Sequence, residues 1–107
     1  KSLIKAGVNF REFAEKSWKL PDNCYDNHYP CIIHGVGLCD EWPLVAYPNR
    51  DFSNADYSAN FEENMTICVE SYIGEVGGKE GIKLEDQFVV TKDGLKQLSS
   101  FPYEIDI

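Results

Sequence analysis

Hydrophobic residues near the start of the chain recur with the spacing of one helix face. The stripe lies within residues 10–19 and consists of Phe10, Phe13, Ala14 and Trp18. Asn9 precedes the stripe and Glu12 follows Asn9 by three residues, which is the pattern of a capping box. Pro21 then limits the helix at its other end. The pattern predicts a helix over residues 10–19 whose apolar face needs a large packing partner, without which it would be exposed.

The first six residues have the character of a helix end. Lys1 and Lys5 suit the negative end of a helix, and Gly7 suits the left-handed conformation that stops one. We therefore expect residues 1–6 to be the last turn of a helix, and the chain to begin within an element of a longer protein.

Three later segments have the patterns of β-strands. Residues 31–38 are apolar and β-branched, and residues 65–73 and 81–91 alternate between apolar and polar positions. The glycine-rich residues 74–81 suit a hairpin link, and residues 92–94 suit a turn. Residues 42–64, rich in Pro, Asn, Asp, Ser and aromatic residues, predict a long and mostly irregular connection. Antiparallel strands with helices to one side predict an α+β fold.

The alternation of the last two strands places carboxylates away from the main apolar face. Glu70 and Glu85 can then face each other across a hairpin, where they repel unless a cation or a proton lies between them. His34 on a third strand would complete a cluster suited to a divalent metal. The pattern alone leaves the ordinary alternative open, in which both carboxylates are simply solvated and the histidine has a structural role.

Composition and charge narrow the class of protein. The chain has 107 residues, which is enough for one modest domain, and its net charge of -8 disfavours binding to nucleic acid. No segment approaches the roughly 18 consecutive apolar residues of a membrane span. The four cysteines form no C-x-x-C pair and lack the spacing of a disulfide framework. We therefore expect reduced thiols and a cytoplasmic protein that binds neither nucleic acid nor membrane.

Three ordered motifs resemble the pita-bread metalloenzymes, the family of creatinase, aminopeptidase P and prolidase. Residues 34–38, His-Gly-Val-Gly-Leu, are similar to the His-Gly-x-Gly-Leu of that family, Glu70 to its strand glutamate, and residues 82–86 to its Arg-Ile-Glu-Asp-type strand. The strand and turn at residues 89–94 are also similar to those that follow in the family. The resemblance implies that residues 1–107 are the carboxyl-terminal part of a pita-bread catalytic domain, with no second domain in this chain.

The resemblance also implies a cofactor and partners. His34, Glu70 and Glu85 would be metal ligands, with Glu85 bridging two divalent ions, and two aspartate ligands would lie upstream in the missing amino-terminal half. Iron, manganese, cobalt and zinc all suit such a donor set, so the metal stays open. The partners we expect are a small-molecule substrate, the missing half of the same protein and, for the full-length protein, a second copy in a homodimer.

The branch of the family is indicated by the residues around His34. The peptidase branches commonly have a histidine four residues before the ligand histidine and another seven after it, where this chain has Pro30 and Glu41. Residues 34–43 are instead similar to the dimethylsulfoniopropionate lyases of this fold, in which an aspartate after the glycines is thought to act as the base; Asp40 matches it. Trp42 could hold the sulfonium of the substrate by a cation-π contact.

Other interpretations of these residues remain open at this level. Asp40 could be a solvated carboxylate at a strand end, and Trp42 could be a core residue. An Xaa-Pro aminopeptidase or dipeptidase is the alternative activity. A metal-free pita-bread binding module is the second alternative, although the presence of all three matched ligands disfavours it.

Overall fold

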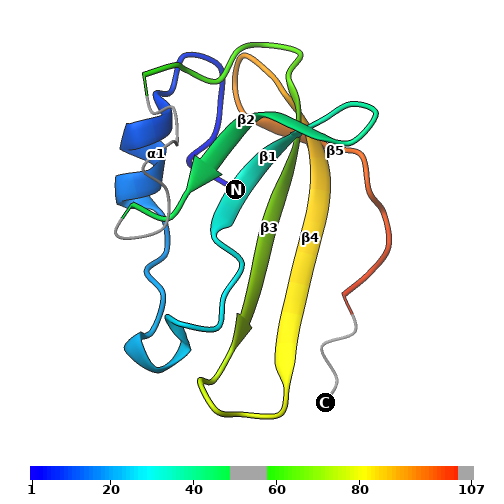
Figure 1. Cartoon of the computed structure of the whole chain (residues 1–107). Helices are drawn as coiled ribbons and strands as arrows, with labels where there is room; N and C mark the ends of the chain where they lie inside the picture. The colour runs from blue at the N-terminus through cyan, green and yellow to red at the C-terminus, as the bar shows by residue number, and fades with distance from the viewer. Residues whose placement is uncertain (49–57, 104–107) are drawn as a thin grey trace.

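The computed structural model describes residues 1–48 and 58–103, which form one antiparallel sheet with a short helix beside it (Figure 1). The elements are α1 (Phe10–Lys16), the 3-10 turn η1 (Asp22–Cys24), β1 (Cys31–Val36), β2 (Asp40–Ala46), β3 (Thr66–Gly74), β4 (Gly81–Val90) and β5 (Leu95–Gln97). The strand order is β2-β1-β3-β4-β5. The α+β prediction is therefore confirmed. Within the described ranges, no helix is long and apolar enough to span a membrane.

Helix α1 begins where the sequence predicts and ends earlier. The Asn9 side chain accepts a hydrogen bond of 3.0 Å from the Arg11 amide, which caps the helix start. The helix ends at Lys16 and not at residue 19, because the Ser17 hydroxyl and amide both donate to the carbonyl of Ala14. Trp18 consequently lies beyond the helix and is more than half exposed.

The apolar face of α1 packs within the chain itself. The Phe61 ring lies 4.7 Å from that of Phe10 and 5.7 Å from that of Phe13, between ring centroids, and all three residues are buried. The same core includes residues of the sheet, namely Ile33, Val45, Ile67, Phe88 and Val90. The expectation that this stripe would be exposed is therefore wrong for Phe10 and Phe13, since residues later in the sequence cover them.

The first residues form turns and not the predicted helical turn. The Ala6 amide donates to Thr91 O at 3.0 Å and the Gly7 amide to Phe61 O at 2.8 Å, so these donors bond to distant segments rather than to the preceding turn of a helix. Gly7 does adopt the predicted left-handed conformation, with a φ of 89°.

Strand β2 occupies part of the segment predicted to be irregular, and the prediction is wrong for residues 42–46. Pro43 removes a backbone donor, but β2 lies at the edge of the sheet, where a missing donor is tolerated. The short edge strand β5 was also not predicted. Residues 49–57 of the same predicted connection lie outside the described residues.

The β3–β4 hairpin has the register on which the site depends. Glu70 pairs directly with Glu85, and Tyr72 with Lys83, across the antiparallel ladder. Strand β1 pairs with the other edge of β3 and places His34 opposite Cys68. The prediction that Glu70 and Glu85 face each other is therefore confirmed.

Candidate metal centre

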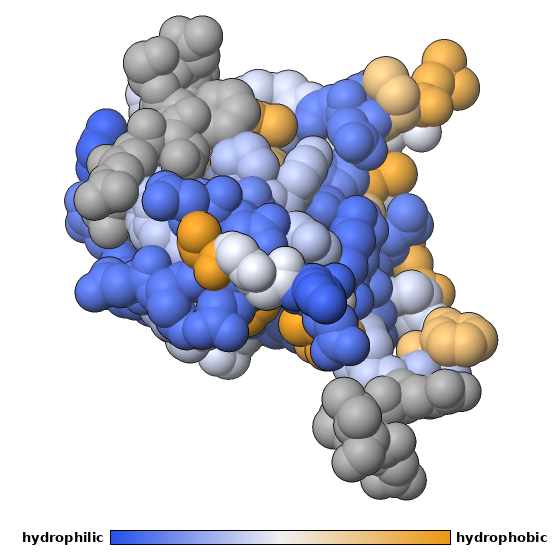
Figure 2. Space-filling model, turned by 60° about the horizontal axis from the view of Figure 1, so that its bottom comes forward, coloured by the Kyte–Doolittle hydropathy of each residue, from blue (hydrophilic) through white to orange (hydrophobic). Residues whose placement is uncertain are grey.

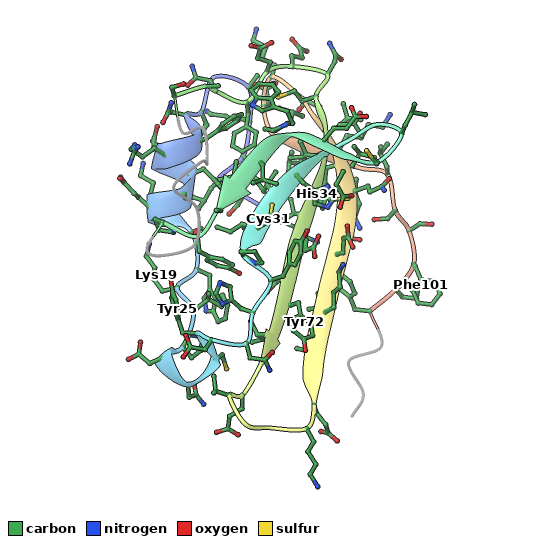
Figure 3. The ribbon with its side chains drawn as sticks, viewed as in Figure 1. Lys19, Tyr25, Cys31, His34, Tyr72 and Phe101 are labelled. Atoms are coloured by element: carbon green, nitrogen blue, oxygen red, sulfur yellow. The ribbon has the colours of Figure 1, made fainter. Side chains whose placement is uncertain are left out.

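Three neighbouring strands bring His34, Glu70 and Glu85 together. His34 Nε2 lies 3.1 Å from Glu70 Oε2 and 3.3 Å from Glu85 Oε1. Figure 3 shows His34 where β1, β3 and β4 run side by side, with Tyr72 farther along β3. Strand alternation causes this clustering, because Glu70 and Glu85 are cross-strand partners on the same sheet face. The structure thus brings together the three residues that the sequence singles out as metal ligands.

The cluster is mostly withdrawn from water. His34 and Glu70 are each 4% exposed, and Glu85 is partly buried. Burial lowers the pKa of His34, but the hydrogen bond to Gly35 O and the nearby carboxylates outweigh burial and raise it overall. Burial tends to raise the pKa of Glu85, but the carboxylate accepts hydrogen bonds, first from Cys68 and then from Lys83, and these leave its pKa lowered overall. The arrangement therefore favours the ionised form of Glu85.

One buried oxygen of the cluster lacks a hydrogen bond. Within the part of the chain that the structure describes, Glu70 Oε1 is buried and accepts no well-oriented hydrogen bond. Lys83 Nζ lies 3.0 Å from this oxygen as an ion pair and 3.2 Å from Glu85 Oε2. The ammonium group of Lys83 is therefore the charged partner of this buried oxygen.

Cys68 joins the cluster, although the sequence did not single it out. Its Sγ, a ring nitrogen of His34 and a carboxylate oxygen of Glu85 all lie within 4.8 Å of one another. Burial raises the pKa of the Cys68 thiol to about 12, with further contributions from the hydrogen bond to Glu85 and its charge. Strand alternation was the available signal, because Cys68 lies two residues before Glu70 on the same face.

Asp40 lies at the rim of the cluster, at the first residue of β2. Its Oδ1 is 3.6 Å from His34 Nδ1, and its side chain is 72% exposed. The tight loop before it is held by Glu41, whose Oε1 accepts a hydrogen bond of 3.2 Å from the Leu38 amide. The Glu41 carboxylate also occupies the space where a Cβ on Gly37 would lie. Asp40 is therefore positioned beside the histidine and open to solvent.

Trp42 lies apart from the other predicted site residues. Its ring packs against that of Phe10 at the start of α1, with centroids 5.8 Å apart, and it is 55% exposed. Its carbonyl oxygen lies against Gly35, where an added Cβ would come within 2.1 Å of it. Among the described residues, the structure therefore gathers four of the five predicted site residues and places Trp42 against the helix.

The donor set suits a divalent cation. One imidazole, two facing carboxylates and a neighbouring thiol are ligand types that transition metals and zinc accept. The two carboxylates face each other across the hairpin, which gives the cluster the negative charge that attracts a cation. On the face of the molecule shown in Figure 2, most of the surface is hydrophilic, with scattered hydrophobic residues.

Comparison with known proteins identifies enzymes with related sequences. The chain is 44% identical over 102 residues to the dimethylsulfoniopropionate lyase DddP of Roseovarius nubinhibens and to that of Roseobacter denitrificans. Each match covers 95% of this chain and 23% of the relative, so the chain spans about a quarter of their length. It is also 33% identical over 84 residues to an Xaa-Pro dipeptidase of Pyrococcus horikoshii, covering 76% of this chain and 20% of that protein.

The fold comparison leads to the same group of proteins. The X-Pro aminopeptidase of Thermotoga maritima matches 94% of this chain and 27% of its own, with a TM-score of 0.63 and 26% sequence identity. This likeness is consistent with a partial pita-bread fold. The model of the family described as "Metallopeptidase family M24" matches residues 1–92, which include His34, Glu70 and Glu85. On this match the chain belongs to metallopeptidase family M24.

Proposed function

We propose that His34, Glu70 and Glu85 are ligands of a centre for two divalent ions in a longer parent protein. Their convergence from three strands and the burial of His34 and Glu70 support this assignment. Glu85, whose two oxygens contact His34 and Lys83, would be the ligand shared by both ions, as in the family that the sequence resembles. Iron, manganese, cobalt and zinc all suit these donors, and the remaining ligands would come from the parent's upstream residues.

We infer that the parent is a lyase that cleaves dimethylsulfoniopropionate to dimethyl sulfide and acrylate. When bound, the metal ions would hold the substrate carboxylate and acidify the adjacent C–H bond. Asp40 then removes the proton from that carbon with its carboxylate. The C–H electron pair forms the C=C bond of acrylate, the C–S bond breaks, and neutral dimethyl sulfide leaves with the bonding pair. The net charge of -8 on the chain suits a cationic sulfonium.

The position of Asp40 is the observation on which this proposal chiefly rests. A base that acts on a substrate must be open to the substrate and next to the groups that hold it. The Asp40 side chain meets both requirements, since it is 72% exposed and lies 3.6 Å from the buried His34 ring. The 44% identity to two dimethylsulfoniopropionate lyases supports the same reaction. We place Trp42 in a secondary role, at the edge of the substrate region, because its ring contacts α1.

An Xaa-Pro peptidase is the second candidate activity. The similarity to an Xaa-Pro dipeptidase and an X-Pro aminopeptidase favours it. The lyase is favoured by the two positions where the peptidases commonly have histidines. Pro30, four residues before His34, has no side-chain proton to transfer, and Glu41, seven residues after it, accepts a hydrogen bond from the Leu38 amide. A metal-free binding module is the remaining alternative, and the presence of His34, Glu70 and Glu85 in one cluster argues against it.

The test uses a purified full-length parent supplied with Fe²⁺, Mn²⁺, Co²⁺ or Zn²⁺ in separate experiments. It should release dimethyl sulfide from dimethylsulfoniopropionate faster than it cleaves an Xaa-Pro dipeptide. Asp40→Asn keeps the shape and removes the base, so turnover should fall by about 10² to 10⁴ while the metal-to-protein ratio stays nearly constant. Asp26→Asn, at an exposed position in another loop, is the matched control and should leave turnover unchanged.

The metal assignment has its own readout. His34→Ala, Glu70→Ala and Glu85→Ala should each lower the metal-to-protein ratio of the parent, and Glu85→Ala should lower it most if this residue bridges both ions. An unchanged ratio in all three variants would refute the ligands. Rapid Xaa-Pro hydrolysis without sulfide release would refute the lyase and leave the metal centre standing.

A further inference from the structure

Lys83 places a positive charge between the two facing glutamates. Its Nζ forms ion pairs of 3.0 Å with Glu70 Oε1 and 3.2 Å with Glu85 Oε2. The position follows from the hairpin register, because Lys83 lies two residues before Glu85 on the same face of β4 and pairs with Tyr72. The Tyr29 ring, whose centroid is 5.7 Å from Nζ, borders the same ammonium group. Lys83 therefore contacts both carboxylates of the candidate centre.

The electrostatics of the pair favour such a cation. Glu70 has a side chain only 3% exposed, and it stands directly opposite Glu85. Two ionised carboxylates at this spacing repel each other, and burial makes the repulsion stronger. His34 contacts one oxygen of each glutamate, whereas Lys83 contacts the other oxygen of each. The ammonium group therefore supplies the charge balance at the two oxygens that the histidine leaves unpaired.

The Lys83 side chain is able to move away from the two carboxylates. It is 52% exposed, although its ammonium group contacts two carboxylates. A divalent ion bound by Glu70 and Glu85 would lie close to the ammonium group that contacts the same two carboxylates, and the charge of the ion would repel that group. An exposed and flexible lysine can turn toward water without rearranging the sheet.

We propose that Lys83 is the counter-cation of the Glu70–Glu85 pair in the metal-free protein and competes with the metal ions for these carboxylates. This inference rests on the proposed metal centre. Lys83 is thus a positioning residue: it holds the two ligand carboxylates together before loading and lowers the affinity of the centre. Loss of the Lys83 charge should therefore make the metal-free protein less stable and make the binding of metal tighter.

The experiment compares four forms of the full-length parent after removal of metal with a chelator. The first two are the wild type and Lys83→Met, which keeps the length of the side chain without its charge. The third is Lys83→Arg, which keeps the charge. The fourth is Lys92→Met, which makes the same change of net charge at an exposed turn. The melting temperature of each metal-free protein and the dissociation constant for Mn²⁺, measured by calorimetry, are the two readouts.

Lys83→Met should lower the metal-free melting temperature by about 1 to 3 degrees, because the two facing carboxylates lose their partly exposed counter-charge. It should also lower the dissociation constant for Mn²⁺ by about tenfold, because one positive charge within contact distance of the ligands is removed. Lys83→Arg and Lys92→Met should stay close to the wild type in both measurements.

Two failures are distinguishable. If the wild-type parent binds Mn²⁺ and Lys83→Met binds it equally or more weakly, the competition is refuted and the proposed metal centre stands. If the wild-type parent binds no Mn²⁺, Fe²⁺, Co²⁺ or Zn²⁺, the metal centre and this inference are refuted together. A Lys92→Met variant with the same changes as Lys83→Met would show that only net charge matters, which also refutes the inference.

Discussion

Asp86 allows a test of how β4, the strand that carries Glu85, is held in place. It follows Glu85 on β4 and points to the opposite face of the sheet, where it is 2% exposed. Lys1 Nζ and Ser99 Oγ each donate to its carboxylate at 2.6 Å, and the Tyr103 hydroxyl donates to the same oxygen as Lys1. One buried carboxylate therefore joins the first residue, β4 and the segment after β5.

The pKa of Asp86 sets the size of the expected effect. Hydrogen bonds, first from Lys1 and then from Ser99 and Tyr103, lower the pKa of Asp86 from 3.8 to about 2. A difference of this size corresponds to about 2 kcal/mol of stability at neutral pH. Lys1 is about half exposed, so screening by water reduces the expected contribution to about 1 to 2 kcal/mol.

Asp86→Asn should therefore loosen the segment that Asp86 holds. The Leu98 amide donates to Gln87 O at 2.8 Å, and its hydrogen exchange reports the opening of this segment. At pH 7 the variant should exchange about 5 to 30 times faster than the wild type at this amide, which corresponds to 1 to 2 kcal/mol. Asp93→Asn removes a carboxylate at an exposed turn and is the matched control.

The pH dependence has a definite sign. The folded pKa of Asp86 is lowered, so its contribution is complete above the unfolded pKa near 4 and is lost as the pH falls toward 2. The ratio of variant to wild-type exchange, compared at equal pH, should fall toward one over this range. A ratio that stays constant from pH 7 to pH 2, or that equals one at pH 7, would refute the assigned role of the charge.

Two further predictions concern the site and the isolated chain. Gly35→Ala should destabilise the parent by about 1 to 3 kcal/mol and displace β2, because the new Cβ would meet Trp42 O at 2.1 Å. Gly94→Ala is the control, since a Cβ at this position has open space, and thermal unfolding compares the two variants. The 107-residue chain alone should bind Mn²⁺ weakly and show no turnover, because it offers only part of the proposed ligand set; stoichiometric binding of two ions in calorimetry would contradict this.

The hairpin that presents the two glutamates could be predicted because its signals are local. Alternation along residues 65–73 and 81–91 fixes which side chains share a face, and a glycine-rich link fixes which strands pair. The predicted facing of Glu70 and Glu85 matches the observed register for this reason. The same alternation puts Lys83 on the face of Glu85, but sequence pattern does not reveal which charged groups a flexible side chain will contact.

The missed elements depend on distant contacts. Pro43 reads locally as a strand breaker, and only the position of β2 at the sheet edge makes a strand possible there. The stripe of α1 appeared to lack a partner because Phe61, which covers it, follows a segment without a clear pattern. Trp42 reads equally well as a cation-π residue or as a packing residue, and its contact with Phe10 arises from the fold.

The two faces of β4 connect the candidate centre to the stability of the chain. Glu85 faces His34 and Glu70, while the next residue, Asp86, anchors Lys1, Ser99 and Tyr103 on the other face. Successive residues of a strand share one backbone, so a displacement of β4 that frees Asp86 also moves Glu85. A carboxylate that bridges two ions tolerates little displacement, because metal coordination requires a fixed geometry. The anchor at Asp86 therefore acts on the position of Glu85 as well as on the segment after β5.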